Sequence, residues 1–216
     1  MPPEPGTTQP AAATPLISRH PAALDALGRL RRADLTRAQF RAEMTRLSSI
    51  LVTEATAHLL GETAVVQGPL RSVAVLEVLP PVFVPVLRAG AAMLDGALTV
   101  WPDSPVGFLG LARNEVTLQS SLYLSRIDEC RDRDVVVLEP MLATGGSLCE
   151  AVARIADLSP RSVAVIGVVA SPDGVARIAA AHPSATLHFA ALDDGLDDDG
   201  YIVPGLGDAG DRAFGV

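Results

Sequence analysis

The chain has 216 residues, and its 25 acidic residues outnumber 17 arginines, with no lysine, to give a net charge of −8. Hydrophobic residues make up 49% of the sequence, which is enough for the core of one domain, while the acidic balance argues against a protein that holds nucleic acid by its phosphates. No apolar run approaches the roughly 20 residues of a membrane-spanning helix and the N-terminus shows no signal segment, so we expect a cytoplasmic protein without a membrane partner.

The N-terminal part of the chain predicts a tail followed by two helices. Residues 1–15 carry prolines among small polar residues, so they are expected to be a disordered tail. Residues 17–32 fit a short helix. In the longer helix that follows, Thr36 and Gln39 form a capping box, and apolar residues at helical spacing continue towards Leu60. These apolar residues are Phe40, Met44, Leu47 and Leu51.

Five arginines are concentrated on these two helices: Arg31, Arg32, Arg37, Arg41 and Arg46. Two interpretations are open, a solvated helix face and a phosphate-binding patch. The solvated face is favoured, because the exposed side of an amphipathic helix ordinarily carries such charges.

The next segments predict a hairpin and a strand that ends in an arginine. Residues 64–79 are irregular and β-like, as in an arm or hairpin. The run 82–87 is a strand, although Pro85 indicates that it is short or incompletely paired. Arg88 follows directly. The end of a central parallel strand is where such sheets bind ligands, so a functional role for this arginine is as well supported as a structural one.

The segment 134–150 has the organisation of a phosphate-binding loop. Residues 134–138 are typical of a strand buried on both faces; Glu139 follows, and then a loop of small residues, 143–147, before a helical pattern. Backbone N–H groups at the start of such a helix point outward, the helix dipole favours an anion, and glycines allow a close approach. A Walker loop is excluded because it needs a lysine, and a G-x-G-x-x-G fingerprint is absent.

An ordinary strand-to-helix turn is the alternative for this loop. Ser147 would then be the N-cap and Glu150 would close a capping box. That alternative leaves the acid at the strand end and the paired glycines unexplained, so phosphate binding is favoured. Cys149 lies beside the loop, and it and Cys130 are expected to be structural free thiols.

The other predicted elements continue an α/β pattern. They are a strand over 106–112 that leads to Arg113, an extended arm over 116–127, a strand over 162–170, a helix from Pro172 to about Ala181 and a strand over 187–192. Strands that alternate with helices imply a mostly parallel sheet covered on both faces.

The C-terminal segment 193–216 differs in composition, with six glycines and seven acidic residues. The apolar stretch 201–204 is followed by the glycine-rich stretch 205–212. A loop that exposes backbone groups beside single acids can recognise a small flat ligand by its edges.

Two of these motifs resemble those of known enzymes. The sequence EPMLATGGS resembles the phosphoribosyl-pyrophosphate (PRPP) motif of type I phosphoribosyltransferases. Together with VPVLRAG and GYIVPGLGDAGDR, it resembles the uracil phosphoribosyltransferase family, collinearly from about residue 17 to residue 214. The resemblance implies an α/β type I phosphoribosyltransferase fold over residues 16–216, in which residues 193–216 form a uracil-binding hood. It also implies transfer of the 5-phosphoribosyl group from PRPP to N1 of uracil, giving UMP and pyrophosphate.

The resemblance further assigns roles to individual residues. Arg88, which follows a cis peptide in the family, and Arg113 would hold pyrophosphate, and Asp208 would face PRPP and the base; these three are the candidate catalytic residues. The PRPP loop would consist of Glu139, Pro140, Met141, Leu142, Ala143, Thr144, Gly145, Gly146 and Ser147, with Glu139 facing the ribose hydroxyls and the Thr144 and Ser147 hydroxyls on the 5′-phosphate. The uracil contacts would be Tyr201, Ile202, Gly207, Asp208 and Ala209, largely through backbone groups.

The resemblance also implies a cofactor and partners. Mg²⁺ would be coordinated by PRPP oxygens, with no side chain as a direct ligand. The family assembles as homodimers or larger homo-oligomers, and whether GTP acts as an effector is left open. The alternatives are a diverged paralogue with another pyrimidine or weak turnover, and a non-catalytic regulator that senses UMP or PRPP.

The chain departs from the family's pattern at three places. Glu139 stands where the family usually has aspartate. Ala91 and Ala92 follow Gly90 where the family has a further glycine in the pyrophosphate loop. The arm over 116–127 retains only the tyrosine and one basic residue of the family's pattern.

Overall fold

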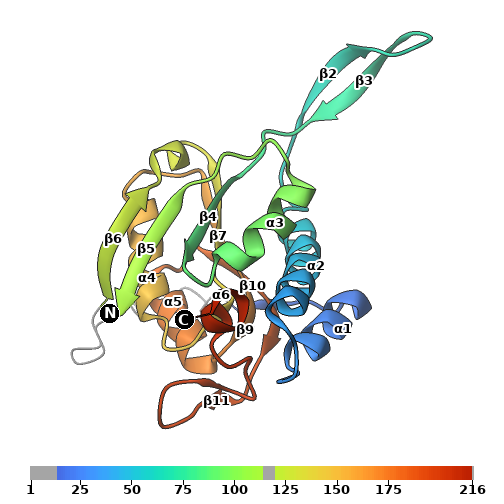
Figure 1. The fold of residues 1–216 in the computed structure, drawn as a ribbon. Coiled ribbons are helices and arrows are strands. Elements are labelled where there is room, and N and C mark those ends of the chain that lie inside the picture. Colours follow the sequence, from blue (N-terminus) through green and yellow to red (C-terminus); the bar gives the residue numbers. More distant parts are fainter. Residues whose placement is uncertain (1–13, 114–119, 216) are drawn as a thin grey trace, which may run out of the picture.

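The computed structural model describes residues 14–113 and 120–215, and its centre is one mostly parallel sheet. Its strands are β1 Leu16–Ile17, β4 Val82–Leu87, β5 Phe108–Arg113, β6 Ser120–Arg126, β7 Asp134–Leu138, β8 Met141–Leu142, β9 Ser162–Ala170 and β10 Thr186–Leu192. Within the described residues their order is β1-β10-β9-β7-β4-β5-β6, with β8 beside β9 (Figure 1). Only β5 and β6 pair antiparallel among these strands. The expected α/β fold is confirmed.

Helices cover both faces of this sheet and enclose two hydrophobic cores. The helices are α1 Pro21–Leu30, α2 Arg37–Ala55, α3 Ala91–Val100, α4 Gly146–Ala156, α5 Pro172–Ala181 and α6 Ala209–Phe214. Strand β7 shows how the faces are divided, because Val136 and Leu138 pack with α1, α2, α3 and α6. Val135 and Val137 point the other way and pack with α4 and α5. This alternation explains why the strand is apolar throughout.

The two N-terminal helices are shorter than the sequence pattern predicts. The helix expected over 17–32 begins only at Pro21, because proline suits the first helical position. Leu16–Ile17 instead pairs in parallel with β10, whose free edge offers backbone partners. The second helix ends at Ala55, before the expected Leu60.

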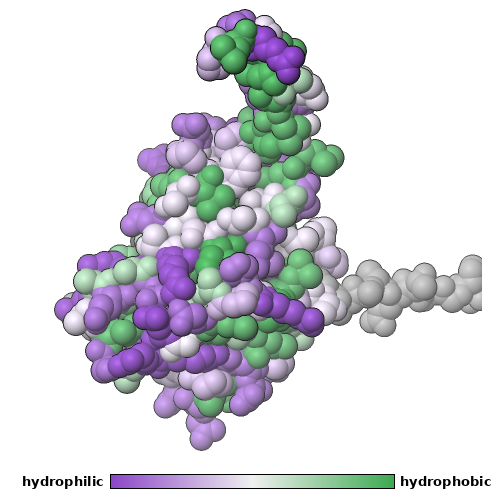
Figure 2. All heavy atoms as spheres, turned by 90° about the vertical axis from the view of Figure 1, so that its right-hand side faces the viewer, coloured by the Kyte–Doolittle hydropathy of each residue, from purple (hydrophilic) through white to green (hydrophobic). Residues whose placement is uncertain are grey.

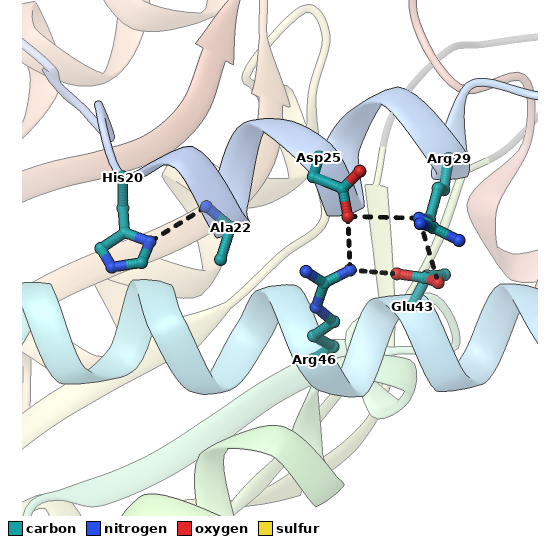
Figure 3. A network of polar contacts seen from close by, with 6 residues as sticks. All are labelled: His20, Ala22, Asp25, Arg29, Glu43 and Arg46. Atoms are coloured by element: carbon teal, nitrogen blue, oxygen red, sulfur yellow. Dashed lines mark hydrogen bonds and ion pairs between the residues drawn. The ribbon is translucent and has the colours of Figure 1, made fainter.

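Polar contacts at the start of α2 and between α1 and α2 hold these helices in place. The Gln39 N–H donates to Thr36 Oγ1 and the Thr36 N–H donates to Gln39 Oε1, which confirms the predicted capping box. Asp25 of α1 accepts from Arg46 of α2 at 2.7 Å and from Arg29 at 3.2 Å (Figure 3). The hydrogen bonds from Arg46 and Arg29 lower the pKa of the Asp25 carboxyl. These side chains lie on the surface, so Arg46 belongs to the solvated helix face that the sequence favours.

The predicted hairpin is present and projects away from the rest of the molecule. Its strands, β2 Glu62–Gln67 and β3 Ser72–Glu77, pair only with each other among the described residues (Figure 1). Its large apolar side chains are exposed, and Figure 2 shows hydrophobic residues along this projection. The most exposed are Leu60, Val65, Leu70 and Leu76. A two-stranded hairpin with apolar side chains on its surface is not stabilised by a core of its own.

Strand β4 shows the incomplete pairing that Pro85 predicts. Residues 82–85 pair with β7, whereas β5 pairs with β4 only at Val86 and Leu87, apart from a single bridge between Phe83 and Val106. The arm expected over 116–127 lies partly outside the described residues. Its described part, β6, forms an antiparallel pair with β5.

The remaining described elements are short. A 3-10 turn, η1, spans Asp128–Cys130, and the C-terminal segment contains β11 Gly195–Leu196 and β12 Ile202–Val203, which pair antiparallel. In the part of the chain that the structure describes, no helix is long and apolar enough to cross a bilayer.

Candidate active site at the carboxyl ends of the strands

The loop between β8 and α4 brings a glycine to the start of α4. Gly145 is the N-cap, with a left-handed φ of +76°, and as a glycine it contributes no side-chain cap. The first turn of α4 contains no acidic residue. The alternative in which Ser147 is the N-cap and Glu150 closes a capping box is therefore wrong, and Glu150 instead pairs with Arg154 at 2.8 Å. A helix start of this kind suits an anion.

Helix α5 supports this loop from behind. The Ser171 hydroxyl donates to the Ala143 carbonyl at 2.6 Å, and a Cβ on Gly174 would lie 2.4 Å from the same carbonyl oxygen, so only glycine allows this contact. Arg177, one turn further along α5, donates from Nη1 to the Thr144 carbonyl at 3.3 Å. Sequence reasoning missed Arg177, because only the packing of α5 on the loop brings its charge there.

Glu139 lies at the end of β7, directly before this loop. Its backbone N–H donates to the Ile166 carbonyl at 3.0 Å, which holds it to β9. Burial raises the pKa of its carboxyl to about 8; the Met141 N–H opposes this shift and the Asp208 carboxylate adds to it. In this state the carboxyl is protonated at neutral pH.

Arg88 is on the loop that joins β4 to α3. The peptide bond between Leu87 and Arg88 is cis, as the resemblance implies. A Cβ on Gly90 would lie 2.3 Å from the Leu138 carbonyl oxygen, so this loop approaches the end of β7 closely. The Arg88 guanidinium extends to α6, where Nη2 donates to Asp211 Oδ1 at 3.1 Å. Arg113 ends β5, one strand further out.

The C-terminal segment forms a compact loop over this edge of the sheet. The Val203–Pro204 bond is cis, and Gly205 and Gly207 have left-handed φ values of +57° and +70°. Asp208 is the N-cap of α6 and accepts from the Asp211 N–H at 2.9 Å. These turns expose Gly207 and Asp208.

Ile202 and Tyr201 differ in their surroundings. Ile202 is buried in the core beside α6, so its side chain anchors the loop, and any contact with a ligand has to come from its backbone. Tyr201 is exposed. Gly210 faces Ala89 of the Arg88 loop, since a Cβ placed on it would lie 3.8 Å from the Ala89 Cβ.

Three segments that are distant in sequence therefore converge: the Arg88 loop, the PRPP loop and the C-terminal loop. Comparison with known proteins identifies the family of the chain. The sequence profile of the family described as uracil phosphoribosyltransferase matches residues 17–216. The chain belongs to the uracil phosphoribosyltransferase family.

Curated relatives agree with the uracil phosphoribosyltransferase assignment. A uracil phosphoribosyltransferase of Ureaplasma parvum serovar 3 is 40% identical over 203 residues, covering 93% of this chain and 98% of the relative. One of Acidovorax sp. (strain JS42) is 41% identical over 200 residues, covering 91% and 96%.

Solved structures agree with the fold. The AQ2163 protein from Aquifex aeolicus superposes with a TM-score of 0.91 at 38% identity, covering 94% of this chain and 99% of that one. A hypoxanthine-guanine phosphoribosyltransferase of Bacillus anthracis superposes with a TM-score of 0.50 at 10% identity, covering 73% and 80%, and so shares the fold alone.

Proposed function

We infer that this uracil phosphoribosyltransferase family member transfers the 5-phosphoribosyl group of PRPP to N1 of uracil and releases UMP and pyrophosphate. The observation that carries this inference is the convergence of segments at the Arg88 loop: Gly90 packs against the Leu138 carbonyl, at the strand end that leads into the PRPP loop, and Arg88 donates to Asp211 of α6, which follows the C-terminal loop. The PRPP loop offers a glycine-capped helix start for an anion, and the C-terminal loop offers backbone groups for a flat base.

The PRPP loop binds the 5′-phosphate and the ribose. Backbone N–H groups of residues 144–147, with the Thr144 and Ser147 hydroxyls, hold the phosphate at the positive end of α4. Within this loop, Pro140, Met141 and Leu142 connect Glu139 to residues 143–147, and Met141 and Leu142 form β8, which pairs with β9. Glu139 accepts hydrogen bonds from the ribose hydroxyls once its carboxyl is ionised.

Arg88 and Arg113 act on the pyrophosphate. Its departure leaves an oxocarbenium-like ribose and concentrates negative charge on the leaving group, which positive groups placed in advance stabilise. The Glu139 and Asp208 carboxyls offer oxygen atoms of the type that surround hydrated Mg²⁺, so the donor set fits a magnesium–PRPP complex. Such an ion would spread the leaving-group charge further.

The C-terminal loop recognises uracil by its edges. Uracil presents alternating C=O and N–H groups, which the backbone of Ile202, Gly207 and Ala209 matches without a charged side chain, while Tyr201 borders the base. Asp208 faces both substrates and steers the N1 proton. Cys130 and Cys149 are free thiols, which accords with the proposed cytoplasmic location.

We also propose that the chain works as a homodimer or larger homo-oligomer in which the hairpin contacts another copy. Apolar side chains lie on both faces of the hairpin: Val65 and Leu76 on one, Val66 and Val73 on the other. Exposed apolar surface of this kind is typical of an interface.

The activity can be tested directly with the purified full chain. It is incubated with PRPP, Mg²⁺ and one nucleobase at a time, and the products are separated by chromatography. UMP and pyrophosphate in equal amounts are expected with uracil. No nucleotide with any base, despite measurable binding of UMP or PRPP, would favour a sensor instead, and a nucleotide from another base would favour a diverged paralogue.

A further inference from the structure

A partly buried ion pair lies beside the C-terminal loop. Arg31, the C-cap of α1, donates from Nη2 to Asp193 Oδ1 at 2.6 Å and from Nη1 to Oδ2 at 3.0 Å. Asp193 is only 7% exposed, and its backbone N–H donates to the Ala170 carbonyl at the end of β9. The pair is thus fixed to the central sheet and to α1 at once.

This ion pair forms hydrogen bonds with both the backbone N–H and the backbone carbonyl of Gly205, and we call this arrangement the clamp. The Gly205 N–H donates to Asp193 Oδ2 at 2.9 Å, and its carbonyl accepts from Arg31 Nη1 at 2.9 Å. No other residue fits here, since φ is +57° and a Cβ would lie 2.0 Å from the Ile202 carbonyl oxygen. Gly205 stands between two candidate uracil contacts, Ile202 and Gly207.

A second arginine holds the next residue of the same loop. Arg212 of α6 donates from Nη1 to the Leu206 carbonyl at 2.7 Å and to the Leu30 carbonyl at 2.6 Å. Its guanidinium also stacks on the ring of Phe40, 4.4 Å from the centroid. Arg31 therefore reaches from α1 to the loop, while Arg212 reaches from α6 to α1. The carbonyls of Gly205 and Leu206 are both held by charged donors, and such hydrogen bonds are stronger than neutral ones.

We propose that Arg31 and Asp193 are positioning residues for uracil: by clamping the Gly205 peptide they fix the backbone groups of residues 207–209 that recognise the base. This inference rests on the proposed assignment of that loop to uracil. Among the described residues, Arg31 and Asp193 donate no hydrogen bond to the PRPP loop or the Arg88 loop and accept none from them. Only Asp208 in the clamped stretch faces both substrates, so loss of the clamp should act far more on the base than on PRPP.

Steady-state kinetics of Arg31→Gln and Asp193→Asn test whether loss of the clamp affects the base more than PRPP. Asp193→Asn keeps the side chain's size and Arg31→Gln shortens it, and each removes one of the paired charges, so the loop is no longer held in one arrangement. We expect the KM for uracil to rise about 10- to 100-fold, as for other small misplacements of binding groups, while the KM for PRPP changes less than about threefold. The double variant should be little worse than either single one, because the two residues act as one unit.

Asp25→Asn and Arg46→Gln are the matched controls. They remove another arginine–aspartate pair, with an Nη1–Oδ2 distance of 2.7 Å, that lies on the surface between α1 and α2. Both KM values should stay as in the wild type. If Arg31→Gln or Asp193→Asn does not fold, Arg31→Lys takes its place, since lysine keeps the charge and can reach only part of the clamp. A smaller but selective rise in the KM for uracil is then expected.

Two further measurements separate this inference from the function on which it rests. Hydrogen exchange at the Gly205 amide should be slow in the wild type and faster in the clamp variants. Gly207→Ala, which strains the backbone of a candidate uracil contact at a φ of +70°, should raise the KM for uracil if the loop binds the base. If Gly207→Ala has that effect and the clamp variants leave both KM values unchanged, or change them in parallel, the inference is overturned. If Gly207→Ala leaves the KM for uracil unchanged while the clamp variants only speed amide exchange, the assignment of the loop fails instead, and the positioning role fails with it.

Discussion

The Arg88 guanidinium and the Asp211 carboxylate lie 3.1 Å apart, and this contact joins the loop after β4 to the last helix. Both side chains remain largely accessible, at 59% and 40% exposure. An exposed pair of this kind adds little to stability. We therefore expect Asp211 to release Arg88 readily to a ligand of higher negative charge.

Replacement of Arg88 by alanine is expected to reduce kcat strongly and to leave the fold intact. The loss should be roughly 10²–10³, or about 3–4 kcal/mol, if the guanidinium stabilises charge on the departing pyrophosphate. The melting temperature should hardly change. UMP formation and thermal unfolding are measured on the same preparations.

Arg161→Ala provides the control for Arg88. Arg161 is 58% exposed and also contacts an aspartate, Asp134, at 3.1 Å, but it lies at the other end of the strands. Its loss should leave kcat unchanged. Full activity of Arg88→Ala, or its unfolding, would assign Arg88 to structure rather than to catalysis.

Use of PRPP should depend on pH through Glu139. The folded pKa of about 8 exceeds the ordinary value of 4.5, so the proton on Glu139 has to leave before the carboxylate can accept from the ribose hydroxyls. The affinity for PRPP should rise as the pH increases towards 8, by up to about tenfold per pH unit, and then level off. Glu139→Gln should lack this dependence and should bind PRPP more weakly at pH 8 by about 1.5–3 kcal/mol.

The free energy of unfolding should also depend on pH through Glu139, but in the opposite direction to the affinity for PRPP. Because folding raises the pKa of Glu139, its protonated form favours the folded state at low pH, and that contribution is lost as the pH rises through about 8. Glu139→Gln should therefore gain stability relative to the wild type between pH 5 and pH 9. Identical pH profiles of unfolding free energy for the wild type and Glu139→Gln would contradict the burial of this carboxyl.

Glu139→Asp should lower activity, and an increase in activity would show that the site is not adapted to glutamate.

Uracil should be converted and cytosine should not. Backbone groups arranged for one order of donors and acceptors leave the exocyclic amino group of cytosine facing another donor, and a site of this type rejects such an analogue by about 10⁴ or more. Competition assays with equal concentrations of both bases measure the ratio of kcat/KM. Comparable rates would show that the C-terminal loop does not select the base by these groups.

Arg177→Ala should weaken PRPP use moderately. Arg177 lies against the PRPP loop but is exposed, so we expect the KM for PRPP to rise about threefold to fivefold, within the ~1 kcal/mol typical of surface charges. The difference should diminish in high salt. Arg154→Ala is the control, because Arg154 is on the neighbouring helix α4 and pairs with Glu150. Equal increases in the KM for PRPP in both variants would mean that the net charge of the protein, and not the position of Arg177, causes the effect.

Polar substitutions on the hairpin should dissociate the oligomer. Val65→Ser and Leu76→Ser remove apolar side chains from one face of the hairpin, and sedimentation should then give a lower mass than for the wild type. Leu24→Ser, at another exposed apolar residue on α1, is the control and should leave the mass unchanged. A wild type that sediments as a monomer at all concentrations would contradict the proposed interface.

Several elements followed from the sequence because their signals are local. The bounds of β4, β7 and β9 match the predicted runs, since strands buried on both faces are apolar throughout. Helix α5 begins at Pro172, as predicted, because proline at the first helical position and the Ser171 cap act within one turn. The PRPP motif and the C-terminal motif were recognisable for the same reason: each is a continuous stretch whose glycines serve one tight turn.

Only the tertiary structure decided how distant groups pair. Leu16 and Ile17 form a strand because the edge of β10 offers them backbone partners, and α4 begins with Gly145 rather than Ser147 as its N-cap. Arg31 appeared in the sequence as one of several surface arginines, yet it closes on Asp193, 162 positions away. Burial likewise set the pKa of Glu139. Such pairings depend on the order of strands in the sheet and on which helices cover it, and no local spacing of residues encodes that order.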